Sequence, residues 1–187
     1  MTIDISKITL TNLIYLFLTL DFLTHNTMAT EIERKFLVKT NDFQTKSHKK
    51  NHIKQGFLSS DKNRIVRIRI CDSQGFITVK GVTNITGMSR FEWEKKIPLE
   101  EAEELITLSE KTVIEKDRYL VKNNSLTFEV DVFLGENKGL IIAEIELSSE
   151  KQTFTKPEWL GKEVTGKTKY YNSSLSKKPY TKWLKKT

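Results

Sequence analysis

The chain has 187 residues, a length that suits one domain with a sizeable core. Hydrophobic residues make up 37% of it and charged residues 29%, which excludes collagen-like, mucin-like and wholly disordered proteins. The single cysteine, Cys71, excludes an internal disulfide and indicates a reducing, cytoplasmic location. The net charge of +7 leaves open a nucleic acid, a membrane surface or a small polyanion as the partner.

The beginning of the chain differs from the rest. Residues 8–23 are apolar, but a membrane-spanning helix needs about 20 apolar residues, and Asp21 lies near the end of this stretch. No small-residue cleavage site follows, as a signal peptide would require. We therefore expect residues 1–27 to form an extension outside the fold and residues 28–187 to form the domain. A membrane anchor is the less favoured interpretation.

From residue 31 onward, apolar and charged residues alternate with a period of two, which predicts β-strands. Tight turns separate most of these strands, and one helical pattern follows Pro98. The expected strands cover residues 31–38, 52–59, 64–71, 76–81, 89–97, 113–121, 126–133 and 140–148. This order predicts a mainly β (α+β) fold, a closed eight-stranded antiparallel β-barrel in meander order with flanking helices, because closure removes exposed strand edges.

The charged face of these strands has an unusual composition. Carboxylates gather on some strands, such as Glu31 with Glu33, and basic residues on others, such as Arg67 with Arg69. For one strand alone, a solvated outer face is the simpler interpretation. Repeated along most strands, the segregation favours an inward-facing set that lines a tunnel.

Such a lining suits a polyphosphate that carries metal ions. Carboxylates that lie side by side repel each other unless a cation lies between them, and a set of oxygen ligands suits Mg²⁺ or Mn²⁺. Guanidinium groups bind phosphate oxygens in pairs, while lysine acts as a point charge. A pure polyanion binder would need the basic set alone, whereas this chain carries both sets.

These residues resemble a known family. "EIERKFLV" at residues 31–38 matches the ExExK signature of the CYTH superfamily, the triphosphate tunnel metalloenzymes. Further motifs are similar in order and spacing to its short bacterial members: "IKQGFLS", "VRIRI", "ITVKG", "SRFEWE", "IEKDRY", "FEVDVF", "AEIEL", "PEWLGKEVTG" and "KYYNSSL". The resemblance extends over residues 29–178 and implies an eight-stranded barrel that encloses a tunnel.

The resemblance also implies roles for individual residues. The metal ligands it implies are Glu31, Glu33, Glu129, Asp131, Glu144 and Glu146. The substrate-binding residues it implies are Lys35, Lys54, Arg67, Arg69, Lys80, Arg90, Lys116 and Arg118. The expected catalytic residues are Glu31, Glu33, Lys35, Lys116, Glu144 and Glu146. Glu92 and Glu94 fall on the same face, where they either pair with basic residues such as Arg90 or take part in catalysis.

Short bacterial members of this family are mostly inorganic triphosphatases that use two divalent cations. The resemblance therefore implies a metal-dependent hydrolase that converts inorganic triphosphate to diphosphate and phosphate. A class IV-type adenylate cyclase, a thiamine or nucleoside triphosphatase and a non-catalytic polyphosphate binder are the alternatives. We expect a small-molecule substrate and no nucleic acid, since no nucleic-acid-binding motif is present. Membrane association is not expected, and a homodimer is left open.

One further pattern points elsewhere. Residues 161–168, "GKEVTGKT", match the G-x-x-x-x-G-K-T signature of a nucleotide-binding P-loop. A P-loop needs a buried strand directly before its first glycine and a helix after its lysine, whereas Pro157 lies close before Gly161. We expect this stretch to lead into a C-terminal helix that caps the tunnel. Lys167 and Lys169 either reach the substrate from there or lie in solvent.

Overall fold

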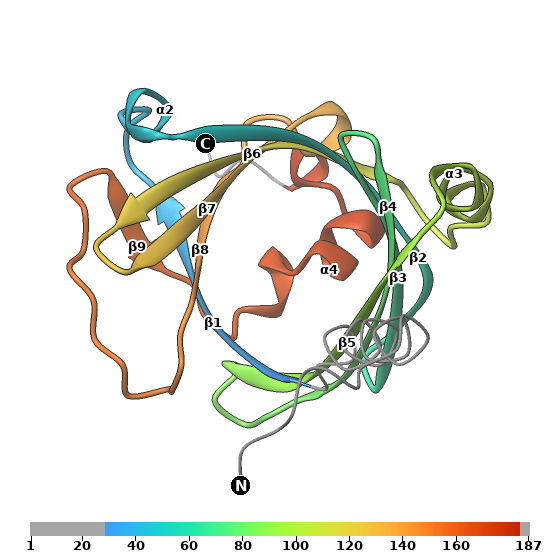
Figure 1. The fold of residues 1–187 in the computed structure, drawn as a ribbon, viewed down its shortest axis with the longest axis horizontal. Helices are drawn as coiled ribbons and strands as arrows, with labels where there is room; N and C mark the ends of the chain where they lie inside the picture. Colours follow the sequence, from blue (N-terminus) through green and yellow to red (C-terminus); the bar gives the residue numbers. More distant parts are fainter. Residues whose placement is uncertain (1–28, 184–187) are drawn as a thin grey trace, which may run out of the picture.

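The computed structural model describes residues 29–183, which form one closed barrel (Figure 1). The proposed extension at residues 1–27 lies outside these residues. The strands are β1 (Ala29–Val38), β2 (Lys49–Asp61), β3 (Arg64–Cys71), β4 (Gln74–Thr83), β5 (Ser89–Ile97), β6 (Ile114–Asn123), β7 (Leu126–Phe133), β8 (Ile141–Glu146) and β9 (Leu160–Glu163). The short helices are α2 (Phe43–Lys46), α3 (Leu99–Thr107) and α4 (Asn172–Lys177). The 3₁₀ turns are η2 (Gly135–Asn137), η3 (Thr168–Tyr170) and η4 (Tyr180–Lys182).

The sheet has the strand order β5-β4-β3-β2-β6-β7-β8-β1-β9, and an additional pairing of β1 with β5 closes the barrel. The first half of β1 pairs with β5, Glu31 opposite Arg90, and the second half pairs with β8, Lys35 opposite Glu144. The predicted closed antiparallel barrel of eight strands is confirmed, with the short β9 added beside β1.

The prediction of a simple meander is wrong at two connections. β1 does not pair with β2, and β5 does not pair with β6; instead β2 pairs with β6. Both connections carry a helix, α2 after β1 and α3 after β5. A tight turn would have forced the flanking strands to pair, whereas a longer connection leaves them free to pair elsewhere.

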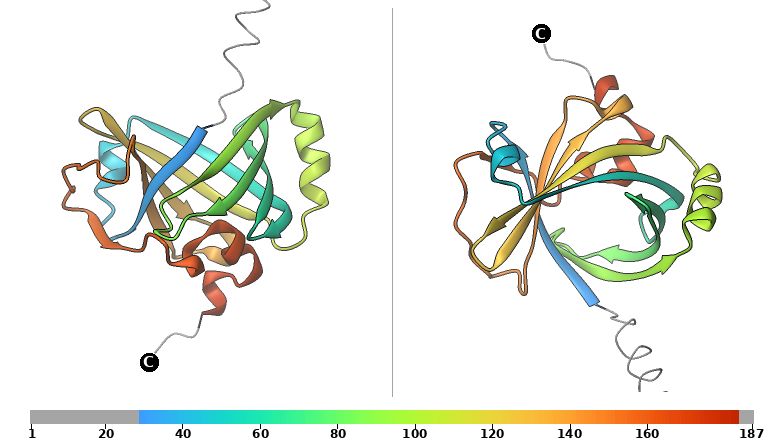
Figure 2. Two further views of the ribbon diagram at one scale, coloured as in Figure 1. Left: turned by 90° about the horizontal axis from the view of Figure 1, so that it is seen from below. Right: turned by 45° about the horizontal axis from the view of Figure 1, so that its top comes forward.

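Two apolar clusters lie on the outside of the barrel, one of them beneath α3, which Figure 2 shows beside the strands. Helix α3 packs on β2, β3 and β4, with Ala102 and Ile106 buried against Ile68. Gly56 and Gly75 permit this close approach, because a Cβ atom at Gly75 would lie 2.6 Å from the Ala102 Cβ. On another side of the barrel, Trp159 packs edge-to-face on Phe128 within a second core.

A third apolar cluster contains residues from the barrel interior. Leu175 of α4 is fully buried there against Phe57, Ile65, Ile114 and Phe133. Viewed along the barrel, α4 lies across its opening (Figure 1). The expected C-terminal helix thus covers one end of the tunnel. No helix within residues 29–183 is both long and apolar enough to cross a membrane.

Candidate active site

The barrel encloses a cavity of about 570 Å³, within the range that small-molecule sites occupy. Its charged lining comes from nearly every strand. The charged residues that line it are Glu31, Glu33, Lys35, Arg67, Arg69, Lys80, Arg90, Glu92, Glu94, Arg118, Glu129, Glu144 and Glu146. The structure therefore brings together in one cavity most of the side chains that the strand alternation predicted.

Lys116 and Asp131 belong to the same network but lie deeper in the wall. Each side chain is only 1% exposed, and the two form an ion pair. Burial lowers the pKa of Lys116 to about 8, against the attraction of Asp131. Attraction to Arg118 and Lys116 outweighs burial at Asp131 and holds the pKa of its carboxyl group below the ordinary value.

Lys54 is not in the cavity, so the sequence-based prediction of its place is wrong. Its side chain is exposed and lies on the outside of the barrel, near His52 and Glu103 of α3. The reason is the strand period of two: Phe57 lines the cavity and Gln55 is buried, whereas Gly56 faces α3. Lys54 shares the outward face of Gly56.

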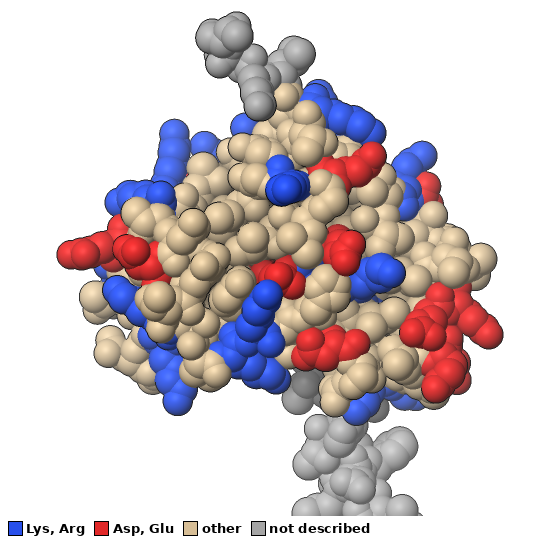
Figure 3. All heavy atoms as spheres, turned by 90° about the horizontal axis from the view of Figure 1, so that it is seen from above, with Lys and Arg blue, Asp and Glu red and all other residues tan. Residues whose placement is uncertain are grey.

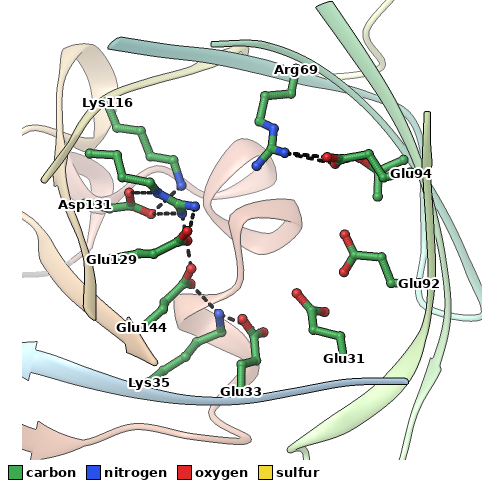
Figure 4. A network of polar contacts seen from close by, with 12 residues as sticks. Glu31, Glu33, Lys35, Arg69, Glu92, Glu94, Lys116, Glu129, Asp131 and Glu144 are labelled. Carbon is green, nitrogen blue, oxygen red and sulfur yellow. Dashed lines mark hydrogen bonds and ion pairs between the residues drawn. The ribbon is translucent and has the colours of Figure 1, made fainter. Parts of the chain in front are cut away.

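Within the cavity, basic side chains are paired with carboxylates from neighbouring strands (Figure 4). On β1 and β8, the Lys35 Nζ lies 2.9 Å from a Glu33 oxygen and also contacts Glu144. Arg118 of β6 donates to both oxygens of Asp131 at 2.7 Å and reaches Glu144 at 3.2 Å. Glu144 is thereby shared by Lys35 and Arg118, and Asp131 is shared by Arg118 and Lys116.

The opposite wall repeats this arrangement with other residues. The Lys80 Nζ lies 2.6 Å from Glu92 and 3.2 Å from Glu31. Arg90 donates to Glu31 at 2.9 Å and to Glu33 at 3.4 Å. The positive charges of Lys80 and Arg90 are thus already paired with carboxylates in this structure.

Glu94 forms the last part of this wall. Arg69 donates to both of its carboxylate oxygens, at 2.8 and 2.9 Å, and Arg67 donates at 3.1 Å. The fully buried Thr78 hydroxyl donates to it at 2.6 Å. Pairing with basic residues and a part in catalysis were the two interpretations left open for Glu94. The structure therefore shows the pairing with basic residues. Its residue type did not identify Thr78 as part of the site, since a threonine on a charged face is common in strands.

Glu146 is the exception among these carboxylates. It forms no ion pair with any residue that the structure describes. Burial raises the pKa of its carboxyl group, and the nearby charges of Glu31 and Glu129 raise it further. This end of the cavity therefore carries unbalanced negative charge.

Of the two alternatives for the lysines after β9, reaching the substrate or lying in solvent, the structure shows the second. Lys167 and Lys169 are exposed, and Lys169 stacks on Tyr170 and Trp183 instead. The same stretch does reach the cavity through three later residues, which line it: Tyr171, Asn172 and Ser173. The alternation of strands could not indicate them, because they lie in a loop and the first turn of α4.

A closed antiparallel barrel with interleaved carboxylates and cations inside belongs to the class of barrels that can hold one small charged ligand. The chain belongs to the CYTH domain family, whose model matches residues 29–180. It is 48% identical over 154 residues to an inorganic triphosphatase of Acetivibrio thermocellus, covering 82% of this chain and 97% of that protein. A Nitrosomonas europaea inorganic triphosphatase is 37% identical over 151 residues, covering 79% and 97%.

Solved structures agree with this assignment. A crystal structure of an inorganic triphosphatase superposes with a TM-score of 0.56 and 34% sequence identity. The match covers 80% of this chain and 95% of that one. The fold and the family predicted from the motifs are therefore confirmed.

Proposed function

We propose that the protein hydrolyses inorganic triphosphate to diphosphate and phosphate inside the barrel. The observation that carries this proposal is the cavity wall, in which cations from β1, β3, β4, β5 and β6 converge on one space. Arginine and lysine at these positions can bind the oxygens of a linear polyphosphate along its length. The names of the relatives support the same substrate.

We propose a divalent cation, Mg²⁺ or Mn²⁺, as the cofactor, with two ions per site. Glu146 supports a cation here, because its charge is unbalanced and it lies among other carboxylates. Within residues 29–183, no three Asp, Glu, His or Cys side chains are already gathered at metal-binding distances. The carboxylates are instead paired with cations, as Glu33 is with Lys35 and Arg90. The proposed ligands are Glu31, Glu33, Glu129, Asp131, Glu144 and Glu146.

Binding would then be an exchange of partners. As the phosphate oxygens take over Lys80 and Arg90, the carboxylate of Glu31 becomes available to a cation. The same exchange at Lys35 and Arg118 would release Glu144. A bound divalent ion supplies charge neutralisation at the phosphates and lowers the pKa of a bound water. The side chains of the cavity keep the chain of phosphates extended and oriented for attack at the terminal phosphorus.

The location of the basic residues favours a small substrate over a nucleic acid. Many of the arginines and lysines discussed above lie inside the barrel. On the face shown in Figure 3, the remaining Lys and Arg side chains lie among Asp and Glu and form no continuous basic surface. A nucleic acid binder would present its cations on an open face.

One assay tests the proposal. The full chain is given tripolyphosphate, and separately ATP, with Mg²⁺ or Mn²⁺, and phosphate, diphosphate and cyclic AMP are measured. We expect phosphate and diphosphate in equal amounts from tripolyphosphate. Cyclic AMP from ATP as the main product would contradict the proposal in favour of a cyclase. Tight binding of tripolyphosphate without turnover with either metal would identify a binder.

A further inference from the structure

The segment between β9 and α4 is hydrogen-bonded to β1 at Lys35. Val164 donates its backbone N–H to the Lys35 carbonyl oxygen at 2.8 Å, and the Lys35 N–H donates to the Thr165 hydroxyl at 3.0 Å. Thr165 also contacts the carboxylate of Glu163 at 2.8 Å. The backbone N–H and carbonyl groups of Lys35 thus hold the beginning of this segment in place.

Two glycines then bring the segment against the loop between β4 and β5. Gly87 and Gly166 have φ angles of +74° and +72°, in the region that side chains disfavour. A Cβ atom at Gly87 would lie 2.5 Å from the Gly166 Cα, so only glycine fits there. The second glycine of the P-loop-like pattern therefore serves a close backbone contact.

This docking places Tyr171 at the cavity. Its side chain is half-buried and lines the cavity, with the hydroxyl oxygen 3.4 Å from where a Cβ of Gly87 would be. Its backbone carbonyl accepts the N–H groups of Ser174 and Leu175, both at 2.9 Å, which ties it to the buried start of α4. The tyrosine is therefore held in place from both sides.

Tyr171 lines the same cavity as Lys35, Arg90 and Glu33. The charges of these three groups act on its hydroxyl. Burial raises the pKa of Tyr171, so the phenol is a neutral donor at neutral pH. The hydroxyl has no hydrogen-bond partner among residues 29–183, and the adjacent Asn172 Oδ1, which is buried, has none there either.

We propose that Tyr171 is a substrate-binding residue, whose hydroxyl donates a hydrogen bond to a phosphate oxygen held by Lys35 and Arg90. This rests on the proposed triphosphatase function, because a phosphate oxygen is an acceptor and the two cations beside the phenol are the ones that would bind it. Glu33 offers no better partner, since it is already paired with both cations. The C-terminal segment thereby adds a contact that no barrel strand supplies.

The test compares Tyr171→Phe with Tyr170→Phe in the full chain. Tyr170 is the matched control, because it precedes Tyr171 directly, packs on Trp183 with a ring separation of 5.5 Å and does not line the cavity. We measure kcat and KM for tripolyphosphate with Mg²⁺. By calorimetry we also measure the affinity for the Mg²⁺ complex of a methylene-bridged triphosphate analogue, which cannot be hydrolysed.

We expect Tyr171→Phe to lower kcat/KM about tenfold or more, as the loss of a hydrogen bond to a charged group predicts. The rise in KM should account for most of it, and the analogue should bind correspondingly more weakly. Tyr170→Phe should match the wild type. Wild-type values for Tyr171→Phe in both measurements would overturn this role and leave the triphosphatase proposal intact. The wild type could also turn over no triphosphate while Tyr171→Phe binds the analogue more weakly than the wild type does. That result would support the contact and refute the reaction.

Discussion

Arg118 and Asp131 face each other on neighbouring strands and form a two-point ion pair. Their Cα positions are in register between β6 and β7, and two N–H groups of the guanidinium donate to the two carboxylate oxygens at 2.7 Å. The Asp131 side chain is only 1% exposed, and Lys116 contacts the same carboxylate. Two cations in the wall of the cavity therefore share one buried anion.

This relationship predicts a large loss of stability for Asp131→Asn. The substitution keeps the shape of the side chain but leaves Lys116 and Arg118 without their shared countercharge. Breaking a buried ion pair from one side costs about 3–5 kcal/mol. Chemical denaturation of the metal-free protein at neutral pH should show a decrease of that size in the free energy of unfolding.

Glu129→Gln is the control for that experiment. Glu129 pairs with the same arginine but is 43% exposed, so water already screens the pair. Its loss should cost less than about 1 kcal/mol. Equal losses for the two variants would show that burial of Asp131 does not set the strength of the interaction.

A second prediction separates the inner and outer faces of the barrel. Lys80→Ala should reduce triphosphate turnover at least tenfold, because Lys80 lines the cavity and is 5% exposed. Lys54→Ala should leave kcat and KM unchanged, because its side chain lies outside the barrel. Steady-state assays with tripolyphosphate measure both. A loss of activity in Lys54→Ala comparable with that in Lys80→Ala would contradict the assignment of the two faces.

Lys54 shows that the sequence alone does not always identify which face of a strand points into the barrel. Strand alternation indicated the inward face well where charged doublets repeat, as at Arg67 and Arg69. In β2 the pattern is ambiguous, since Lys54 and Gln55 are both polar and only one of them points inward. The choice is made by packing: Gly56 must face α3, where a Cβ would lie 1.9 Å from the Ser109 hydroxyl oxygen. That contact joins elements distant in sequence.

The pairing of strands and the role of the C-terminal segment were hidden for the same reason. The local pattern identifies β2 and β6 as strands, but nothing local tells that Ile53 lies opposite Lys116. Tyr171 reaches the cavity only because Gly87 and Gly166 meet. The carboxylates and cations of the site were predictable because their chemistry repeats along the chain. The neutral groups among them were not.

A third prediction concerns the carboxylates of β1. Glu31→Ala should abolish metal-dependent turnover if Glu31 is a metal ligand, and added Mg²⁺ or Mn²⁺ should not restore it. Treatment of the wild type with a chelator should have the same effect but should be reversed by added metal. Glu115→Ala serves as the control, since Glu115 is 45% exposed and contacts His52 outside the barrel. Activity retained in Glu31→Ala would refute its assignment as a ligand.

The last prediction concerns Glu144 and Glu146, which lie two residues apart on β8 and differ in the sign of their effect on stability. At Glu144, attraction to Lys35 and Arg118 outweighs burial and holds the pKa well below the ordinary 4.5. Its charge therefore stabilises the fold above about pH 4.5, and this contribution is lost as the pH falls through the lower, folded-state pKa. At Glu146 burial and neighbouring carboxylates raise the pKa, so its charge destabilises the metal-free fold at neutral pH.

We therefore expect Glu144→Gln to unfold at lower denaturant concentration than the wild type at pH 7, with a difference that narrows as the pH falls below about 4.5 toward the lower folded-state pKa of Glu144. Glu146→Gln should be more stable than the wild type at pH 7 without metal. If Glu146 binds the cation, added Mg²⁺ should stabilise the wild type more than this variant, since a ligand raises stability only in the protein that binds it. Denaturation midpoints with and without Mg²⁺ measure both effects, and the same direction of change in the two variants at pH 7 would contradict the assignment of opposite signs.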